Sequence, residues 1–206
     1  ANTTGSNNAS VGTYALDANT TGSGNIALGY NALGANTTAN DNVAIGYEAL
    51  KLNTTGTRNV AVGAYCGDAL TTGNDNVAMG YFSLSAATTG TQNVALGMNA
   101  LAAGTTASSN VAIGAYALDA ATTAGSNIAI GLYALSSANS GNNVAIGSYS
   151  LQDLSTGTQN CAVGRNTMLE LTTGNYNAAF GAYAMQNSTT GNLSLIHISE
   201  PTRPPE

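Results

Sequence analysis

The chain is built from a short internal repeat, and this repeat limits the folds open to it more than any other feature. Asn, an apolar residue, a small residue, a second apolar residue and Gly recur in that order eleven times between Asn8 and Gly181. The residue number of the Asn rises by seventeen at each step, except from Asn127 to Asn143, where it rises by sixteen. The unit reads N-[V/I]-A-[V/I/L/M]-G-x-x-[A/S]-L-x-x-N-T-T-G-x-x, and we number its positions from the first Asn.

The pattern within the unit is typical of β-structure. Positions 1 to 5 alternate between large apolar side chains and small or polar ones, which predicts a strand. The pair at positions 8 and 9, as at Ala32 and Leu33, predicts a second short strand, and Thr54-Thr55-Gly56 is a turn sequence. A unit of this length with two short strands and two turns fits one coil of a β-solenoid.

These observations predict an all-β fold, a parallel β-roll of eleven seventeen-residue coils that occupies residues 1–192. Coils stacked at about 4.8 Å form a rod of about 50 Å. We expect each coil to bury about three large apolar side chains. So thin a core motivates the hypothesis that several copies of the chain associate.

The Asn at position 1 is present in every unit. Identical side chains stack above one another in a solenoid, so their amides are expected to form a hydrogen-bonded ladder. The alternative is a polar recognition stripe. The residues are Asn8, Asn25, Asn42, Asn59, Asn76, Asn93, Asn110, Asn127, Asn143, Asn160 and Asn177.

Position 5 is Gly in every unit, which predicts a bend or a close approach of two backbones. Position 3 is Ala in ten units and Ser10 in the first. So small a residue implies tight packing against the opposite side of the roll or against a neighbouring chain. The structural glycines are Gly12, Gly29, Gly46, Gly63, Gly80, Gly97, Gly114, Gly131, Gly147, Gly164 and Gly181.

Tyrosine occupies position 6 or 7 in nine units, which indicates a place on the rim of the roll with the hydroxyl in water. The alternative is a row of rings that stacks on sugars and binds a surface. The residues are Tyr14, Tyr30, Tyr47, Tyr65, Tyr81, Tyr116, Tyr133, Tyr149 and Tyr183. Adjacent Thr pairs such as Thr71-Thr72 raise the further alternative of ice binding, although that usually requires Thr-x-Thr.

Charged residues make up 7% of the chain, with four Lys and Arg against ten Asp and Glu. This balance argues against nucleic acid and anionic membranes as partners. A charged column would repel itself at each step, which explains the shortage. The acidic residues show no fixed place in the unit, and no catalytic set is present. We therefore expect no enzymatic activity, no metal, no cofactor and no membrane span.

The two cysteines are expected to be free, buried and apolar in character. Cys66 is at position 8 and Cys161 at position 2, six coils apart. Stacking at about 4.8 Å places them about 29 Å apart, whereas a disulfide requires Cα atoms within about 7 Å.

The motif N-V-A-I-G-Y-x-A-L-x-x-N-T-T-G resembles the head repeats of trimeric autotransporter adhesins and the repeats of phage tail-fibre-domain proteins. The resemblance covers residues 1–192. It implies a left-handed parallel β-roll assembled as a parallel homotrimer, with attachment to surfaces as its role. The usual head repeat of that family is shorter than the unit of this chain, so the cross-section here is expected to differ.

The repeat pattern stops at Asn192. Residues 193–206 form a non-repeat tail, which we expect to be disordered. Its sequence S-L-I-H-I-S-E-P-T-R-P resembles a translated sequencing adapter, and a native linker is the alternative. The adapter interpretation makes the chain a fragment of a longer fibre, without a visible signal peptide, and gives His197 no role.

The sequence therefore predicts a non-catalytic segment of a fibrous surface adhesin or phage tail fibre, located outside the cell, on a cell surface or on a virion. It would extend the fibre and attach it to a host or surface. The receptor, a glycan or a protein, is open. The alternative is an ice- or glycan-binding solenoid that uses its Thr or Tyr arrays.

Overall fold

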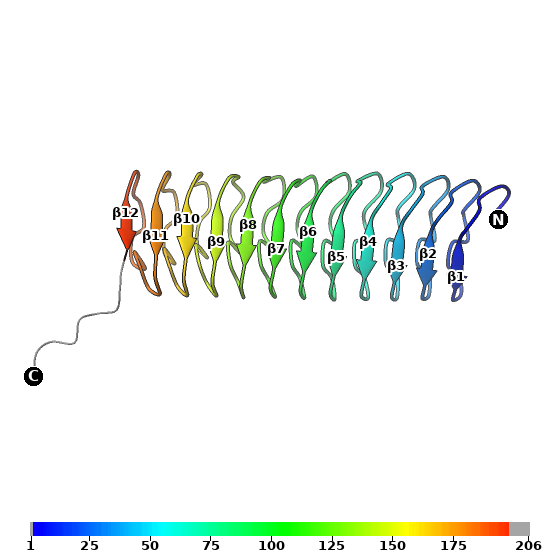
Figure 1. Cartoon of the computed structure of the whole chain (residues 1–206), viewed down its shortest axis with the longest axis horizontal. Helices are drawn as coiled ribbons and strands as arrows, with labels where there is room; N and C mark the ends of the chain where they lie inside the picture. The colour runs from blue at the N-terminus through cyan, green and yellow to red at the C-terminus, as the bar shows by residue number, and fades with distance from the viewer. Residues whose placement is uncertain (1, 198–206) are drawn as a thin grey trace, which may run out of the picture.

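The computed structural model describes residues 2 to 197. Twelve strands of three residues each form one parallel sheet in chain order (Figure 1). The described chain is an all-β parallel solenoid without a helix, and its first and last coils lie at opposite ends. The strands are β1 (Ala9–Val11), β2 (Ile26–Leu28), β3 (Val43–Ile45), β4 (Val60–Val62), β5 (Val77–Met79), β6 (Val94–Leu96), β7 (Val111–Ile113), β8 (Ile128–Ile130), β9 (Val144–Ile146), β10 (Cys161–Val163), β11 (Ala178–Phe180) and β12 (Leu195–His197).

Each strand pairs in register with the same positions of the next unit. Ala61 of β4 is opposite Ala78 of β5, and Ala129 of β8 is opposite Ala145 of β9 across the shorter step. Every position in the unit therefore forms a column along the solenoid.

The expected second strand at positions 8 and 9 is absent, and each described coil has one strand. Positions 7 and 9 adopt left-handed backbone conformations, which interrupt an extended chain. The residues at position 9, Leu in most coils, have φ between 48° and 58°. These bends turn the Leu side chains into the roll, where Leu33, Leu50 and Leu101 are fully buried.

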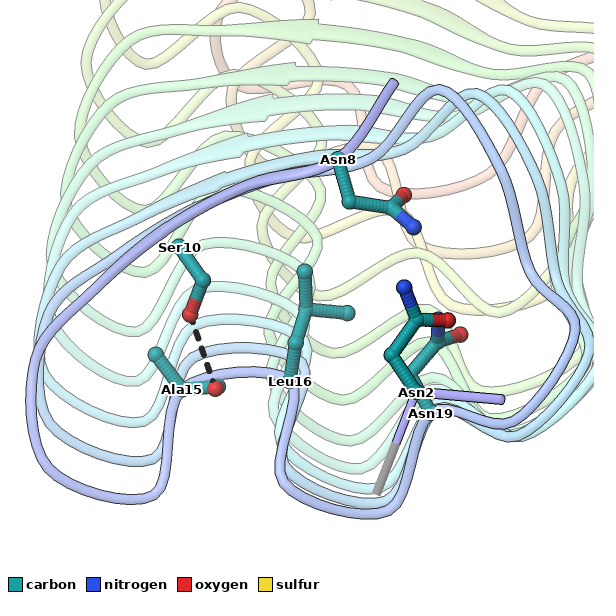
Figure 2. A pocket seen from close by; sticks show the side chains of 6 residues that line it. All are labelled: Asn2, Asn8, Ser10, Ala15, Leu16 and Asn19. Carbon is teal, nitrogen blue, oxygen red and sulfur yellow. Dashed lines mark hydrogen bonds between the residues drawn. The ribbon is translucent and has the colours of Figure 1, made fainter. Parts of the chain in front are cut away.

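The strands bury their small side chains and not the large apolar ones that the expected core requires. Position 3 faces the interior, where Ala44, Ala95 and Ala129 have no exposed surface. Positions 2 and 4, with Val, Ile and Leu, face outward, so the expectation of about three large buried side chains per coil was wrong. The tight packing at position 3 is against the opposite side of the same roll. Figure 2 shows Asn8 and Ser10, from positions 1 and 3, pointing inward in the first coil.

The position 5 glycines are required by the backbone. Their φ angles lie between 116° and 138°, a region that side-chain-bearing residues rarely adopt. A Cβ atom on Gly97 would lie 2.7 Å from the carbonyl oxygen of Gly114. The coils thus approach closely at this bend, and the glycines form a column of their own.

The shorter coil, which begins at Asn127, keeps the register by a local substitution. The carbonyl of Ser140 accepts the Asn127 Nδ2 hydrogen bond, which position 15 accepts in other coils. Asn139 Oδ1 accepts from the hydroxyl and backbone N–H of Thr122, in place of a backbone carbonyl. The missing residue is therefore the second Thr of the pair, and the columns continue on both sides.

The coil geometry continues beyond the last residue that fits the repeat pattern. Strand β12 pairs with β11, and the backbone N–H of Ser194 donates to Asn177 Oδ1 at 3.1 Å. Our expectation for residues 198–206 lies outside the described residues. At the other end, Asn2, Asn8, Leu16 and Asn19 line a hollow of about 200 Å³, which is the interior of the first coil (Figure 2).

Candidate functional site: the outer surface of the coils

The position 1 asparagines lie inside the roll. Asn93 Nδ2 donates to Asn76 Oδ1 at 3.1 Å and to the carbonyl of Ala107 at 2.8 Å. The backbone N–H of Asn93 donates to the same Asn76 oxygen at 3.1 Å. From Asn25 to Asn177 these residues are at most 2% exposed. They satisfy buried polar groups between coils and are not available as a recognition stripe.

A second column of asparagines, at position 12, was not singled out from the sequence. Asn36 Nδ2 donates to Asn19 Oδ1 at 2.8 Å, and Asn53 Nδ2 donates to the carbonyl of Gly56. The column ends where Leu70 replaces Asn, so Asn53 Oδ1 is buried without a hydrogen-bond partner among the described residues. The N-T-T-G sequence was read only as a turn, although its Asn recurs at one position.

An apolar strip runs along the outside of the sheet, and we call it the apolar sheet face. It consists of the position 2 and position 4 side chains of β2 to β11, all half-buried or exposed and none charged. Ile26, Met79 and Ile128 are 38%, 45% and 38% exposed although neighbours stack on both sides. Its members are Ile26, Leu28, Val43, Ile45, Val60, Val62, Val77, Met79, Val94, Leu96, Val111, Ile113, Ile128, Ile130, Val144, Ile146, Cys161, Val163, Ala178 and Phe180.

The apolar sheet face is about as large as the largest apolar patch of a typical single protein. The length of the strip is set by its ten strands, which lie about 4.8 Å apart. Its width is set by the two outward columns, about 7 Å apart, and by the width of their side chains. The projected area of the strip is therefore roughly 500 Å². The largest apolar patch on a typical single protein covers about 300–600 Å², and such a patch often marks an interaction site. This strip is therefore the strongest candidate site on the surface.

In three consecutive coils the residue at position 17, two residues before the strand begins, carries a charged side chain beside the sheet. Arg58 Nε donates to Asp75 Oδ1 at 2.6 Å in the next coil, and this contact raises the pKa of Arg58 and lowers the pKa of Asp75. Asp41 occupies the same column one coil earlier. These groups are exposed, so the pair contributes little stability. They place charge along part of one edge of the apolar sheet face.

Along the other edge, after the Gly bend, the nine tyrosines at positions 6 and 7 are half-buried or exposed. Many contact the ring of the next coil. Tyr30 and Tyr47 stack with ring centroids 5.1 Å apart and planes at 12°, and Tyr116 and Tyr133 stack at 4.9 Å and 5°. Tyr183 instead packs against the guanidinium of Arg165, which lies 4.7 Å from the ring centroid. Stacked rings cover part of one another's faces, which are the surfaces that a sugar would need.

The two threonines of each pair have different roles. The first donates its hydroxyl to the backbone of the next coil, as Thr71 Oγ1 does to the carbonyl of Thr88 at 2.9 Å. The second is exposed in nearly every coil, and we call this column the threonine row. The row consists of Thr21, Thr38, Thr55, Thr72, Thr89, Thr106, Thr123, Thr156, Thr173 and Thr190.

Three acidic residues share one place in the unit, which the sequence analysis missed. Asp17, Asp68 and Asp119 are all at position 10, at intervals of three coils. Burial raises the pKa of Asp68 and of Asp119, and Asp68 Oδ1 has no hydrogen-bond partner among residues 2–197. Within that part of the chain, no three His, Cys, Asp or Glu side chains come together as a metal site.

The two cysteines are free, as expected, but they differ in exposure. Cys66 is buried inside the roll, and this burial raises the pKa of its thiol to about 12. Cys161 is half-buried on β10, where position 2 faces outward. The expectation that Cys161 is buried was wrong, for the same reason that the outward orientation of Val and Ile was missed.

The fold and its columns define the chain as a parallel β-solenoid repeat protein. Comparison with protein-family models, with curated proteins and with solved structures finds no match. Over residues 2–197 there is no helix long and apolar enough to cross a membrane.

Proposed function

We propose that this chain is a non-catalytic rod segment of a fibrous surface protein, an adhesin or a phage tail fibre, whose copies pack side by side through the apolar sheet face. The single observation that carries this proposal is the continuous outward strip of Val, Ile and Leu along the described solenoid. An apolar patch of this size often marks an interaction site.

A second copy of the chain is the occupant that fits the strip. Each partner in a stable complex buries about 800 Å². The solvent-accessible area of the strip is larger than its projected area of roughly 500 Å², because its side chains protrude from the sheet. A straight partner with the same spacing of coils matches it along its length, and the resemblance to adhesin heads favours three parallel copies.

Attachment to a host or surface is the role that this architecture supports outside the cell. The remaining columns of the rod, including the threonine row and the exposed tyrosines, are accessible to a surface that the rod contacts. The resemblance of the repeat to adhesin heads and tail-fibre repeats is the support for this part of the proposal. A glycan or protein receptor would be bound by these outer columns or by other parts of the fibre.

The association is tested by adding charge to one side of the rod. The variant Ile113→Asp/Ile130→Asp adds two carboxylates to the apolar sheet face, and its matched control Thr106→Asp/Thr123→Asp adds them to the threonine row. Sedimentation equilibrium at micromolar concentration should show an associated wild type, an associated control and a monomeric Ile variant. Circular dichroism should remain unchanged in all three. A monomeric wild type contradicts the proposal.

The two cysteines provide an independent reporter. Cys161 lies on the apolar sheet face and Cys66 lies inside the roll. With a thiol-specific dye, the monomeric variant should react once per chain, at Cys161. The associated wild type should be protected at both thiols until it is denatured. A wild-type Cys161 that reacts as fast as the thiol of the monomeric variant would place the interface elsewhere.

The threonine row supports a second candidate, ice binding. In three coils Thr is followed by a buried Gly and another Thr, as at Thr55-Gly56-Thr57, so a Thr-x-Thr arrangement does occur. Thermal hysteresis of the wild type, lost in Thr72→Asp/Thr89→Asp, would support it. The Ile113→Asp/Ile130→Asp variant should keep the hysteresis, and an inactive wild type excludes this candidate.

A further inference from the structure

The aromatic residues beside the sheet form two uninterrupted runs. In the first, the tyrosines from Tyr14 to Tyr81 contact one another in succession, at centroid distances between 5.1 Å and 6.2 Å. In the second, Tyr116, Tyr133 and Tyr149 stack in succession at 4.9 Å and 5.6 Å. The runs are separated by the coil that carries Met98 and Asn99 at the equivalent positions.

These rings are close together and also accessible. Tyr30 and Tyr47 are 41% and 46% exposed, and the three rings of the second run are half-buried. Each ring is held in its place by the parallel strand pairing of its coil, so neighbouring phenols stay close without any encounter between chains. Holding two reactants together in this way raises the rate of a reaction between them.

We propose that the aromatic runs are a site of oxidative cross-linking, at which an oxidant of the peroxidase and peroxide class joins tyrosines of adjacent coils. Removal of one electron and one proton from each of two phenols gives two phenoxyl radicals. Their unpaired electrons are shared with the ring carbons next to the hydroxyl-bearing carbon. A bond forms between two of these carbons, and the hydrogen on each then moves to the oxygen.

The reaction balances with one molecule of hydrogen peroxide for each cross-link. The peroxide accepts the two electrons and two protons and becomes two molecules of water. The product is a dityrosine that connects residues one unit apart in the sequence, as for Tyr30 and Tyr47 or Tyr133 and Tyr149. Such a bond closes a covalent loop around one coil, which restricts the unfolded chain in the way that a disulfide does.

Tyr133 and Tyr176 provide a matched pair for the test. Tyr133 is the middle ring of the second run, so Tyr133→Phe leaves Tyr116 and Tyr149 two coils, about 10 Å, apart. Tyr176 is 56% exposed and has no ring contact among the described residues. Tyr176→Phe therefore removes one exposed phenol without interrupting a run.

The folded protein is treated with a haem peroxidase and hydrogen peroxide at low micromolar concentration. Dityrosine is measured by its fluorescence and located by mass spectrometry of chains that still migrate as monomers in denaturing gels. We expect cross-links between Tyr30 and Tyr47 and within the second run. Tyr133→Phe should reduce second-run cross-links to background, whereas Tyr176→Phe should leave them unchanged.

Denatured wild-type protein serves as the control for proximity, because it contains the same phenols without the stacking. Its cross-links should be spread over all tyrosines, Tyr176 included. The proposal is overturned if the folded protein gives the same spread as the denatured one. It is also overturned if second-run cross-links persist in Tyr133→Phe, or if all products join separate chains.

Discussion

Two glycines of one coil, Gly97 and Gly104, show how the backbone of this solenoid selects residues. Gly97 has a φ of 133°, and a Cβ atom there would lie 2.7 Å from the backbone of Gly114. At Gly104 a Cβ would instead meet the side chain of Leu101 at 3.0 Å, and the equivalent position holds Ala87 and Ala121 in neighbouring coils. One glycine is required by conformation, and the other is replaceable.

We expect Gly97→Ala to lower the free energy of unfolding by about 3 kcal/mol, because backbone strain of about 1–3 kcal/mol adds to a contact that only backbone movement can relieve. Gly104→Ala should leave it unchanged or raise it by about 0.5 kcal/mol, because the substitution reduces the freedom of the unfolded chain. Urea denaturation of both variants measures the difference. Equal stability of the two would show that the close approach at position 5 is not needed.

At the scale of the single strand, most of the fold was predictable. The alternation of positions 1 to 5 predicts the strand, and the constant spacing predicts its pairing with the next unit. The direction of the side chains was missed, although it was implicit in the Asn column. Adjacent strand residues face opposite sides, so a buried Asn42 places Ala44 inside and Val43 and Ile45 outside.

Other features of the coil could not be read from residue types. Leu at position 9 favours a strand or a helix by its usual propensity, yet Leu50 has a φ of 48°. The contacts of neighbouring coils impose this conformation, and the local sequence does not predict it. The stacking of the tyrosine rings was equally unpredictable, because the sequence places Tyr30 and Tyr47 in one column but does not set the angle between their rings. Tertiary packing determines both.

The hydrogen bonds of the Asn column predict the effect of a substitution on stability. Asn93→Ala removes one rung and leaves the buried backbone N–H of Asn110 and the Nδ2 of Asn110 without the oxygen that they share. Buried polar groups without partners cost about 1–3 kcal/mol each, so we expect a loss of about 2–5 kcal/mol. Thr89→Ala, an exposed residue of the threonine row, should change stability by less than about 0.5 kcal/mol. Chemical denaturation compares the two, and a neutral Asn93→Ala would contradict a stabilising role for the ladder.

At the scale of the whole molecule, each strand of the described solenoid contacts only the strands before and after it. Stability in such an architecture is close to a sum of the contributions of coils and of the interfaces between them. The chain also tolerates the shorter coil, because Asn139 supplies the missing acceptor. Length is therefore adjustable, provided that the columns remain aligned.

Deletion of residues 77–93 tests this property. It removes one complete unit and brings Val94 directly after Asn76, so every column can stack again. The shortened chain should fold with the same circular dichroism spectrum. The slope of its free energy of unfolding against urea concentration should fall by about one tenth, in proportion to the surface exposed on unfolding. Deletion of residues 77–85 removes half a unit and should abolish cooperative unfolding. A folded half-unit deletion would refute the column model.

The direction of the Asn hydrogen bonds gives the rod an electrical polarity. Asn25, Asn42 and most of the other rungs donate their side-chain N–H to the previous coil and offer their oxygen to the next. The amide dipoles of the column therefore add head to tail and reinforce one another. One end of the column presents a positive pole and the other a negative pole, so two rods lying antiparallel attract through this column, and two parallel rods meet a small repulsion that their apolar contacts must exceed.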